Sequence, residues 1–202
     1  MILRILTTFL FAMGIQFVAA QNEQEFELRI CTLLEKSSGY QNIEKIIDLI
    51  EWESDIIKNI PCISPIMPPD FRNLHISSSY GERYHPILNE YKHHSGIDIP
   101  AAMGDSVYAA ANGKIIKAGY DSALGNYLRI QHGYGFSSIY GHLSTILVSV
   151  GDTVIIGQNI GLVGNSGRST GSHLHYAIKK GKNEENSLPY CFLLIKMINK
   201  KR

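Results

Sequence analysis

The 202-residue sequence has almost no excess of charge of either sign, with 19 Lys and Arg against 18 Asp and Glu. Because a strong positive balance is what attracts polyanions, this composition gives no reason to expect a nucleic-acid partner or an anionic membrane surface. The sequence also lacks internal repeats and low-complexity tracts. A substrate or partner must therefore be inferred from a local site.

Cysteine is scarce, with only 3 residues: Cys31, Cys62 and Cys191. In an oxidising compartment a bridge between Cys62 and Cys191 would tie together the two ends of the core. Connectivity cannot be read from spacing alone, so this bridge is a hypothesis.

Long apolar runs are also lacking beyond the N-terminus. Residues 1–20 combine Arg4, an apolar run over residues 5–13, and the small residues Ala19 and Ala20 before a polar stretch. This order is typical of a secretory signal peptide and predicts cleavage after Ala20, with export to the periplasm or the cell exterior. An uncleaved anchor, which would leave a weak membrane tether, is the alternative. No cysteine lies directly after the run, where a processed N-terminus could accept a lipid.

Proline is absent before residue 61, and 16 of the 18 glycines lie between residues 81 and 181. This shift predicts a domain boundary near residues 61–69, where PCISPIMPP interrupts any helix. Residues 21–60 then form a helical N-terminal segment, with helices over Glu23–Leu34 and Asn42–Lys58.

The second of these helices carries an apolar stripe at helical spacing: Ile43, Ile46, Ile47 and Ile50. Such a stripe could cover an active site, bind a partner, or pack on the chain's own domain. We favour packing because an apolar stripe usually faces its own domain. A segment that holds an enzyme inactive until it is displaced is a further alternative.

After residue 61 the pattern changes to short β-rich runs between turn signals: GKIIKAG, NYLRIQHG, FSSIYGHL, DTVIIG, NIGLVG and HLHYAIKK. Six runs at spacings near ten residues, without helical periodicity between them, predict a mainly β domain over residues 61–202 with an antiparallel sheet as its core. The tail from Tyr190 is apolar and then basic, and is expected to form a last strand or a short helix.

Three histidine-bearing clusters lie in this β region: HSGID from His94 to Asp98, YGH from Tyr140 to His142, and HLH from His173 to His175. Alternate residues of a strand project from the same face, so the two histidines of HLH can both point into one groove. The four-residue spacing of HSGID is also even, and Gly96 allows its backbone to approach closely. The two pairs can therefore reach a common centre.

Catalytic zinc typically takes three protein ligands from His and carboxylate and keeps a fourth position for water. Two histidines and one aspartate satisfy that count, and the ion lowers the pKa of its water to about 7. The remaining histidines could transfer protons and hydrogen-bond a developing oxyanion.

Four consecutive motifs over residues 76–181 resemble the lysostaphin-type, LytM-like family of zinc endopeptidases, which cut peptidoglycan cross-links: ISSSYGERYHPI, HHSGIDIPAAMGDSVYAAANGKI, GNYLRIQHGYGFSSIYGHLS and VSVGDTVIIGQNIGLVGNSGRSTGSHLHYAI. The resemblance implies one zinc ion per chain. Its implied ligands are His94, Asp98 and His175.

The same resemblance implies that His142 and His173 are catalytic and that Asn126 and Tyr140 contact substrate. The expected substrate is the stem peptide of peptidoglycan, cut at a D-alanyl link to a diamino acid in preference to a glycyl-glycine link, by a monomeric enzyme. The alternative is a non-catalytic regulator that binds cell wall or activates an amidase. Arg83, in the first motif, could bind a substrate carboxylate or hold the adjacent loop through backbone carbonyls, and the second role is favoured.

Overall fold

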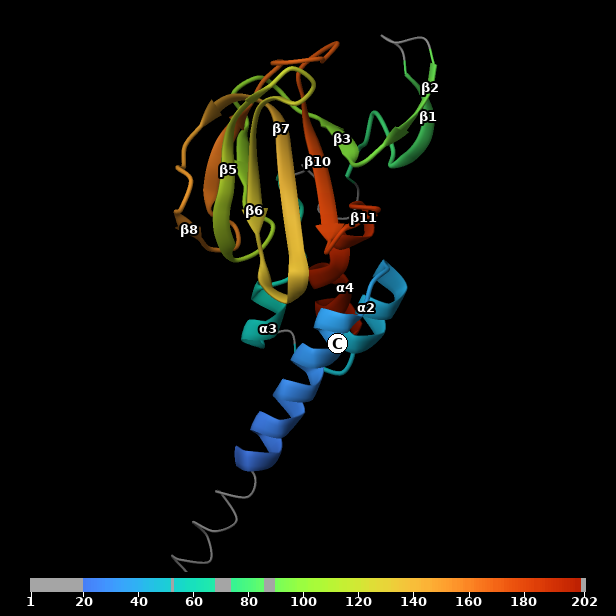
Figure 1. Ribbon diagram of the computed structural model, residues 1–202, viewed down its shortest axis with the longest axis vertical. Helices are drawn as coiled ribbons and strands as arrows, with labels where there is room; N and C mark the ends of the chain where they lie inside the picture. Colours follow the sequence, from blue (N-terminus) through green and yellow to red (C-terminus); the bar gives the residue numbers. More distant parts are fainter. Residues whose placement is uncertain (1–19, 52, 68–73, 86–89, 201–202) are drawn as a thin grey trace, which may run out of the picture. The chain divides into compact units, whose positions relative to one another are not determined.

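The computed structural model describes residues 20–51, 53–67, 74–85 and 90–200 (Figure 1). The chain divides into two compact units, Met1–Ser37 and Ser38–Arg202. In the first unit residues 20–36 are helical, which confirms the helix predicted over Glu23–Leu34. The predicted signal peptide lies outside the described residues except for Ala20. No helix among the described residues has both the length and the apolar character needed to cross a bilayer.

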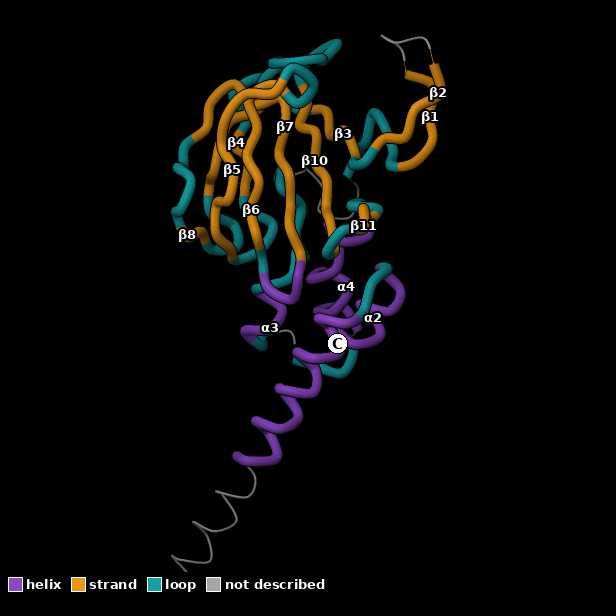
Figure 2. The backbone as a smooth tube through the Cα atoms, in the orientation of Figure 1, coloured by secondary structure: helices purple, strands orange, loops and turns teal. Residues whose placement is uncertain are grey.

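The second unit is built on a nine-stranded antiparallel sheet (Figures 1 and 2). Its strands are β3 (Ile97–Pro100), β4 (Ser106–Tyr108), β5 (Gly113–Asp121), β6 (Gly125–Gln131), β7 (Phe136–Ile146), β8 (Thr153–Val154), β9 (Asn159–Val163), β10 (His173–Lys180) and β11 (Asn183–Glu185). The main strand order is β11-β10-β7-β6-β5-β8, while β3 pairs with β10 and β9 pairs with both β4 and β7. The predicted mainly β, antiparallel fold is confirmed.

The alternation of side chains in β6 shows why these residues form strands. Leu128 and Ile130 are fully buried, whereas Arg129 between them is partly exposed. A period of two places one set of side chains in the core and the other toward solvent. In β10, by contrast, Leu174 and Tyr176 are fully buried and so are most of the other residues. This makes β10 a central strand of the core.

A separate two-stranded antiparallel sheet precedes β3. It consists of β1 (Gly81–His85) and β2 (Glu90–His94), with Arg83 directly opposite Lys92. Because β2 ends at His94, this histidine lies at the end of the hairpin, shortly before β3 begins.

The second unit also contains short helices: α2 (Tyr40–Ile47), α3 (Asp55–Lys58), the 3-10 turns η1 (Gly133–Gly135) and η2 (Pro189–Phe192), and α4 (Leu193–Lys200). The prediction of a single helix over Asn42–Lys58 was wrong, because the structure has two separate helices there. The chain turns after Ile47 and starts again at α3, where the Ser54 side chain caps the new helix by accepting the N–H of Ile56. Of the two forms expected for the tail, a last strand or a short helix, the structure shows the helix, α4.

The isoleucine stripe at Ile43, Ile46, Ile47 and Ile50 is buried, so it packs on its own domain as favoured from the sequence. Polar contacts add to this packing, since the Gly39 N–H donates to Glu185 and Lys200 pairs with Asp48. For this reason α2 and α3 belong to the unit that holds the sheet. That unit begins at Ser38, whereas composition alone placed the boundary near residues 61–69.

Cys62 and Cys191 are buried free thiols, so the hypothetical bridge between them is absent. Their Sγ atoms lie 3.7 Å and 3.5 Å from the carbonyl oxygens of Ile57 and Ser187. Burial raises the pKa of each thiol to about 12, so neither is a reactive thiolate at neutral pH.

Candidate metal centre and cleft

The register of the sheet brings the HSGID and HLH motifs together. Strand β10 runs between β3 and β7, which places His175 opposite Asp98 on one side and opposite Gly141 on the other. A side chain at Gly96 would put its Cβ 2.4 Å from the carbonyl oxygen of Tyr176, so only glycine lets this turn lie against β10. The close approach predicted from the sequence at Gly96 is therefore present.

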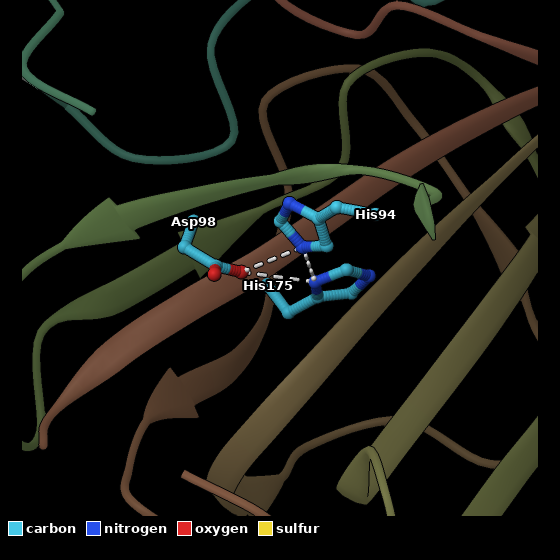
Figure 3. A group of neighbouring side chains, drawn as sticks. All are labelled: His94, Asp98 and His175. Atoms are coloured by element: carbon cyan, nitrogen blue, oxygen red, sulfur yellow. Dashed lines mark hydrogen bonds and ion pairs between the residues drawn. The ribbon is translucent and has the colours of Figure 1, made fainter. Parts of the chain in front are cut away.

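One atom from each of three buried residues converges on a single point, as Figure 3 shows. Nε2 of His94 lies 3.2 Å from Oδ1 of Asp98 and 3.1 Å from Nδ1 of His175. Nδ1 of His175 lies 3.0 Å from the same Oδ1. The structure thus brings together all three residues for which the sequence predicted metal binding.

Hydrogen bonds behind this triangle fix its protonation. Nδ1 of His94 lies 2.9 Å from the carbonyl oxygen of Ser79, and since a carbonyl only accepts, that nitrogen carries the proton. Nε2 of His94 is therefore the nitrogen that faces the carboxylate: it can donate a proton there, and once that proton is lost it offers a lone pair to a cation. Burial alone would raise the pKa of Asp98, but hydrogen bonds from His175 and His94 lower it overall, so the carboxylate is ionised. Burial lowers the pKa of His175, which favours its neutral form.

These residues fit a zinc ion. When its imidazole is neutral with the proton on Nδ1, Nε2 of His94 and Oδ1 of Asp98 are two acceptors 3.2 Å apart, and a metal cation beside both offsets their repulsion. Tetrahedral zinc with bonds of 2.0–2.1 Å separates its ligand atoms by about 3.3 Å, close to the three observed separations. Neutral imidazole nitrogens and a carboxylate are also the donor types that zinc prefers.

His142 is brought to the same centre by an irregularity in β7. Its φ of 61° is in the left-handed region, and its N–H donates to the Leu124 carbonyl at 2.6 Å. The pairing of β7 with β6 shifts by one residue at this position, as in a β-bulge. Nδ1 of His142 lies 2.8 Å from the Ser166 carbonyl oxygen, so Nδ1 holds the proton and Nε2 keeps its lone pair. Burial lowers the pKa of His142 to about 4.

His173 is oriented in the same way by a backbone carbonyl. Its Nδ1 lies 2.8 Å from the oxygen of Gly171, and its Nε2 lies 3.7 Å from Oδ1 of Asp98. The rings of His142 and His173 are 4.6 Å apart between centroids. Two further imidazoles with available Nε2 atoms therefore lie beside the three converging donors.

These five residues open into one cleft of about 220 Å³. Its walls come from the β1–β2 hairpin on one side and from two loops, residues 123–124 and 168–170, on the other. The remaining lining residues are Arg83, Lys92, His93, Ser95, Ala123, Leu124, Arg168, Ser169 and Thr170.

Tyr140 does not reach this cleft, which corrects the prediction that it contacts substrate. Its side chain is completely buried, and its hydroxyl accepts the N–H of Ala110 at 3.0 Å. Tyr140 packs against Tyr176, and neighbouring residues of a strand face opposite ways, so both point away from the side that His175 faces. The sequence argument missed the bulge that separates His142 from the face of Tyr140.

Asn126 lies behind the cleft and is not among its lining residues. Its side-chain amide donates to the Leu143 carbonyl at 3.1 Å, and its N–H donates to the Ser166 hydroxyl at 2.9 Å. Asn126 therefore joins the two segments that hold His142, and its contact with substrate stays a prediction.

Sequence reasoning also missed the groups that orient the histidines: the carbonyl oxygens of Ser79, Ser166 and Gly171. Backbone carbonyls have no side-chain signature, so residue type could not reveal them. The glycines and small hydroxyl residues of NSGRSTGS are the available signal, because such residues favour a tight turn and so indicate a defined backbone path before His173.

The fold and the site together define an antiparallel β domain of the lysostaphin type with a metal-binding cleft. Comparisons with known proteins support this description of the fold and the site. Peptidase family M23 matches residues 92–187. The catalytic domain of lysostaphin, an antimicrobial peptidase from Staphylococcus simulans, superposes with a TM-score of 0.55 and 31% identity, covering 60% of this chain and 94% of that domain. The chain belongs to peptidase family M23.

Two further proteins are similar over this region. A zinc-containing peptidase from Vibrio cholerae has a TM-score of 0.56 at 33% identity, covering 63% of this chain and 39% of that one. The peptidoglycan DD-endopeptidase ShyC of Vibrio cholerae is 41% identical over 110 residues, which are 54% of this chain and 25% of that protein. The chain spans about a quarter of the length of such curated relatives.

Proposed function

We propose that this chain is an exported, monomeric zinc metalloendopeptidase that hydrolyses peptide cross-links of peptidoglycan. The observation that carries the proposal is the convergence of three donor atoms within 3.0–3.2 Å of one another, beside two further histidines with available Nε2 atoms. One zinc ion per chain would be held by His94, Asp98 and His175. When bound, zinc supplies a Lewis acid that polarises the scissile carbonyl and lowers the pKa of water.

His142 and His173 are the proposed catalytic residues. In hydrolysis one water adds to the carbonyl carbon, the C–N bond breaks, and the amine leaves with an added proton. A neutral imidazole Nε2 accepts the proton from the attacking water, and the resulting imidazolium returns it to the amine nitrogen or hydrogen-bonds the oxyanion. The low pKa of His142, about 4, keeps it in the accepting form at neutral pH.

The substrate class follows from where the chain acts and from its relatives. The signal-peptide pattern of residues 1–20 favours export to the periplasm or the cell exterior, where peptidoglycan lies. Similarity to a peptidoglycan DD-endopeptidase supports the D-alanyl link to a diamino acid over a glycyl-glycine link.

The test uses the full chain, loaded with zinc, and purified cross-linked muropeptide dimers. Mass spectrometry should show each dimer converted to two monomers with the gain of one water, and the new termini should identify the bond. A His142→Asn variant is the matched control, since it should bind zinc without cleaving. Intact dimers in the presence of zinc-loaded protein would reject the enzyme and favour a non-catalytic regulator that binds cell wall or activates an amidase.

A further inference from the structure

The walls of the cleft are cationic although the chain as a whole is nearly neutral. Among the described residues that line the cleft, Arg83, Lys92 and Arg168 are basic and Asp98 alone is acidic. A cleft of one sign concentrates ligands of the opposite sign. The composition gave no hint of this, because the 19 basic and 18 acidic residues balance over the whole sequence.

Arg83 is the basic residue whose contact with the metal-binding group is visible. It lies on β1 opposite Lys92, its side chain is 27% exposed, and its Nη2 is 3.6 Å from Oδ2 of Asp98. The other oxygen of that carboxylate, Oδ1, belongs to the converging donor triangle. The guanidinium is therefore adjacent to the proposed zinc site, beside which the scissile bond would lie.

The Nε–H of Arg83 is buried, and no hydrogen-bond partner for it lies among the described residues. An unpaired buried donor is costly, and the planar edge of a guanidinium matches the two oxygens of a carboxylate. Lys92 would add a second positive charge across the hairpin without fixing the geometry. Arg83 lines the cleft with 27% of its side chain exposed, so its guanidinium suits an anionic, planar group supplied by the ligand, and a small rotation of the side chain would bring the unpaired Nε–H to that group.

We propose that Arg83 binds a free carboxylate of the substrate, attached to the same carbon as the nitrogen of the scissile amide. This inference rests on the proposed function and narrows its substrate class. A diamino acid with a carboxylate at its cross-linking centre provides this group, whereas the residue after the scissile bond of a glycyl-glycine bridge does not. The structural role favoured from the sequence for Arg83 is the competing account.

The experiment measures binding as well as cleavage, so that the two proposals can fail separately. Two peptides are compared that carry a D-alanyl link to meso-diaminopimelate, one with the free carboxylate beside the scissile nitrogen and one with a carboxamide there. Dissociation constants are measured by calorimetry on zinc-loaded, full-length His142→Asn protein, with and without Arg83→Gln. Cleavage is measured on the wild type.

The acid should bind about 10- to 100-fold more tightly than the amide, the range of a hydrogen bond to a charged group. Arg83→Gln should remove that preference and leave zinc content unchanged. Arg129→Gln, which alters an arginine bonded to Ser137 outside the cleft, should preserve it.

Equal binding of acid and amide, undetectable binding of the acid, or an equal loss for both peptides in Arg83→Gln would overturn the carboxylate site. The last of these results would instead make Arg83 a positioning residue for Asp98. If the acid binds preferentially through Arg83 but the wild type cleaves neither peptide, the carboxylate site stands and the proposed enzyme activity fails.

Discussion

The cleft and a buried polar cluster contain histidines that are equally hidden from solvent. His94 and His175 in the cleft are 8% and 6% exposed, and His132 in the cluster is 6% exposed. The buried polar cluster consists of His132, Ser138 and Tyr140, joined by contacts of 2.6 Å and 2.9 Å through the Ser138 hydroxyl.

The two regions differ in what their ring nitrogens meet. Both nitrogens of His132 have partners in the protein, the Asn112 carbonyl at 2.7 Å and the Ser138 hydroxyl. In the cleft, Nε2 of His94 meets only other potential ligands, Asp98 and His175. Burial therefore does not distinguish a metal ligand from a structural histidine. What distinguishes them is whether both ring nitrogens already have hydrogen-bond partners in the protein. The cleft should control activity and the cluster should control stability.

The largest effect that separates the two regions is expected at His142. The substitution His142→Asn keeps a residue that tolerates the left-handed backbone but removes the proton acceptor. We expect kcat to fall about 10²- to 10⁴-fold, the usual contribution of a general base or acid. Zinc content and the unfolding midpoint should stay close to those of the wild type. Steady-state kinetics on muropeptide dimers provide the measurement, and an unchanged kcat would remove His142 from the mechanism.

A second effect should appear in the cluster as pH-dependent stability. Burial lowers the pKa of His132 to about 4, below the value of about 6.5 in the unfolded chain. His132 therefore binds a proton less readily in the folded protein than in the unfolded chain. Its neutral form contributes fully to the free energy of unfolding above pH 6.5, and this contribution is lost as the pH falls toward 4. The loss is about 3 kcal/mol, from roughly 1.4 kcal/mol per pH unit.

Urea unfolding of the wild type and His132→Asn at pH 7 and pH 4 measures this term. The unfolding free energy of the wild type minus that of His132→Asn should be smaller at pH 4 than at pH 7, by about 3 kcal/mol. The exposed His75, replaced in the same way and measured at both pH values, is the control for a histidine outside the cluster. A constant difference for His132→Asn would show that its burial has no such linkage.

The smallest effect is expected at Asn126, which supports the cleft from behind. Asn126→Ala removes the bond to the Leu143 carbonyl and should cost about 1 kcal/mol of unfolding free energy. Activity should fall by roughly tenfold or less through kcat, because His142 loses part of its support. Asn159→Ala, which removes an exposed bond to Ser106, is the matched control. A large rise in KM without loss of stability would restore Asn126 to the substrate-binding role.

From the period of two in strands, the sequence predicted the mainly β fold and indicated that the HSGID and HLH motifs could reach a common centre. The choice of His94, Asp98 and His175 as ligands, and the substrate contact of Tyr140, came from the resemblance to a known family. The structure brings the three expected ligands together but buries Tyr140, because β7 is irregular where the backbone of His142 becomes left-handed. The compact unit that holds the sheet begins at Ser38, ahead of the boundary predicted near residues 61–69. Composition changes where proline begins, but the buried isoleucines of α2 join the preceding residues to the sheet domain.

The most direct test of the difference between cleft and cluster is the zinc content of His175→Ala compared with His132→Asn. After dialysis against a chelator and reloading, metal analysis should find one zinc ion per chain in the wild type and in His132→Asn, and none in His175→Ala at the same zinc concentration. If His175→Ala retains one zinc ion at wild-type affinity, His175 is not a zinc ligand, and the proposed difference between the cleft and the buried polar cluster is wrong.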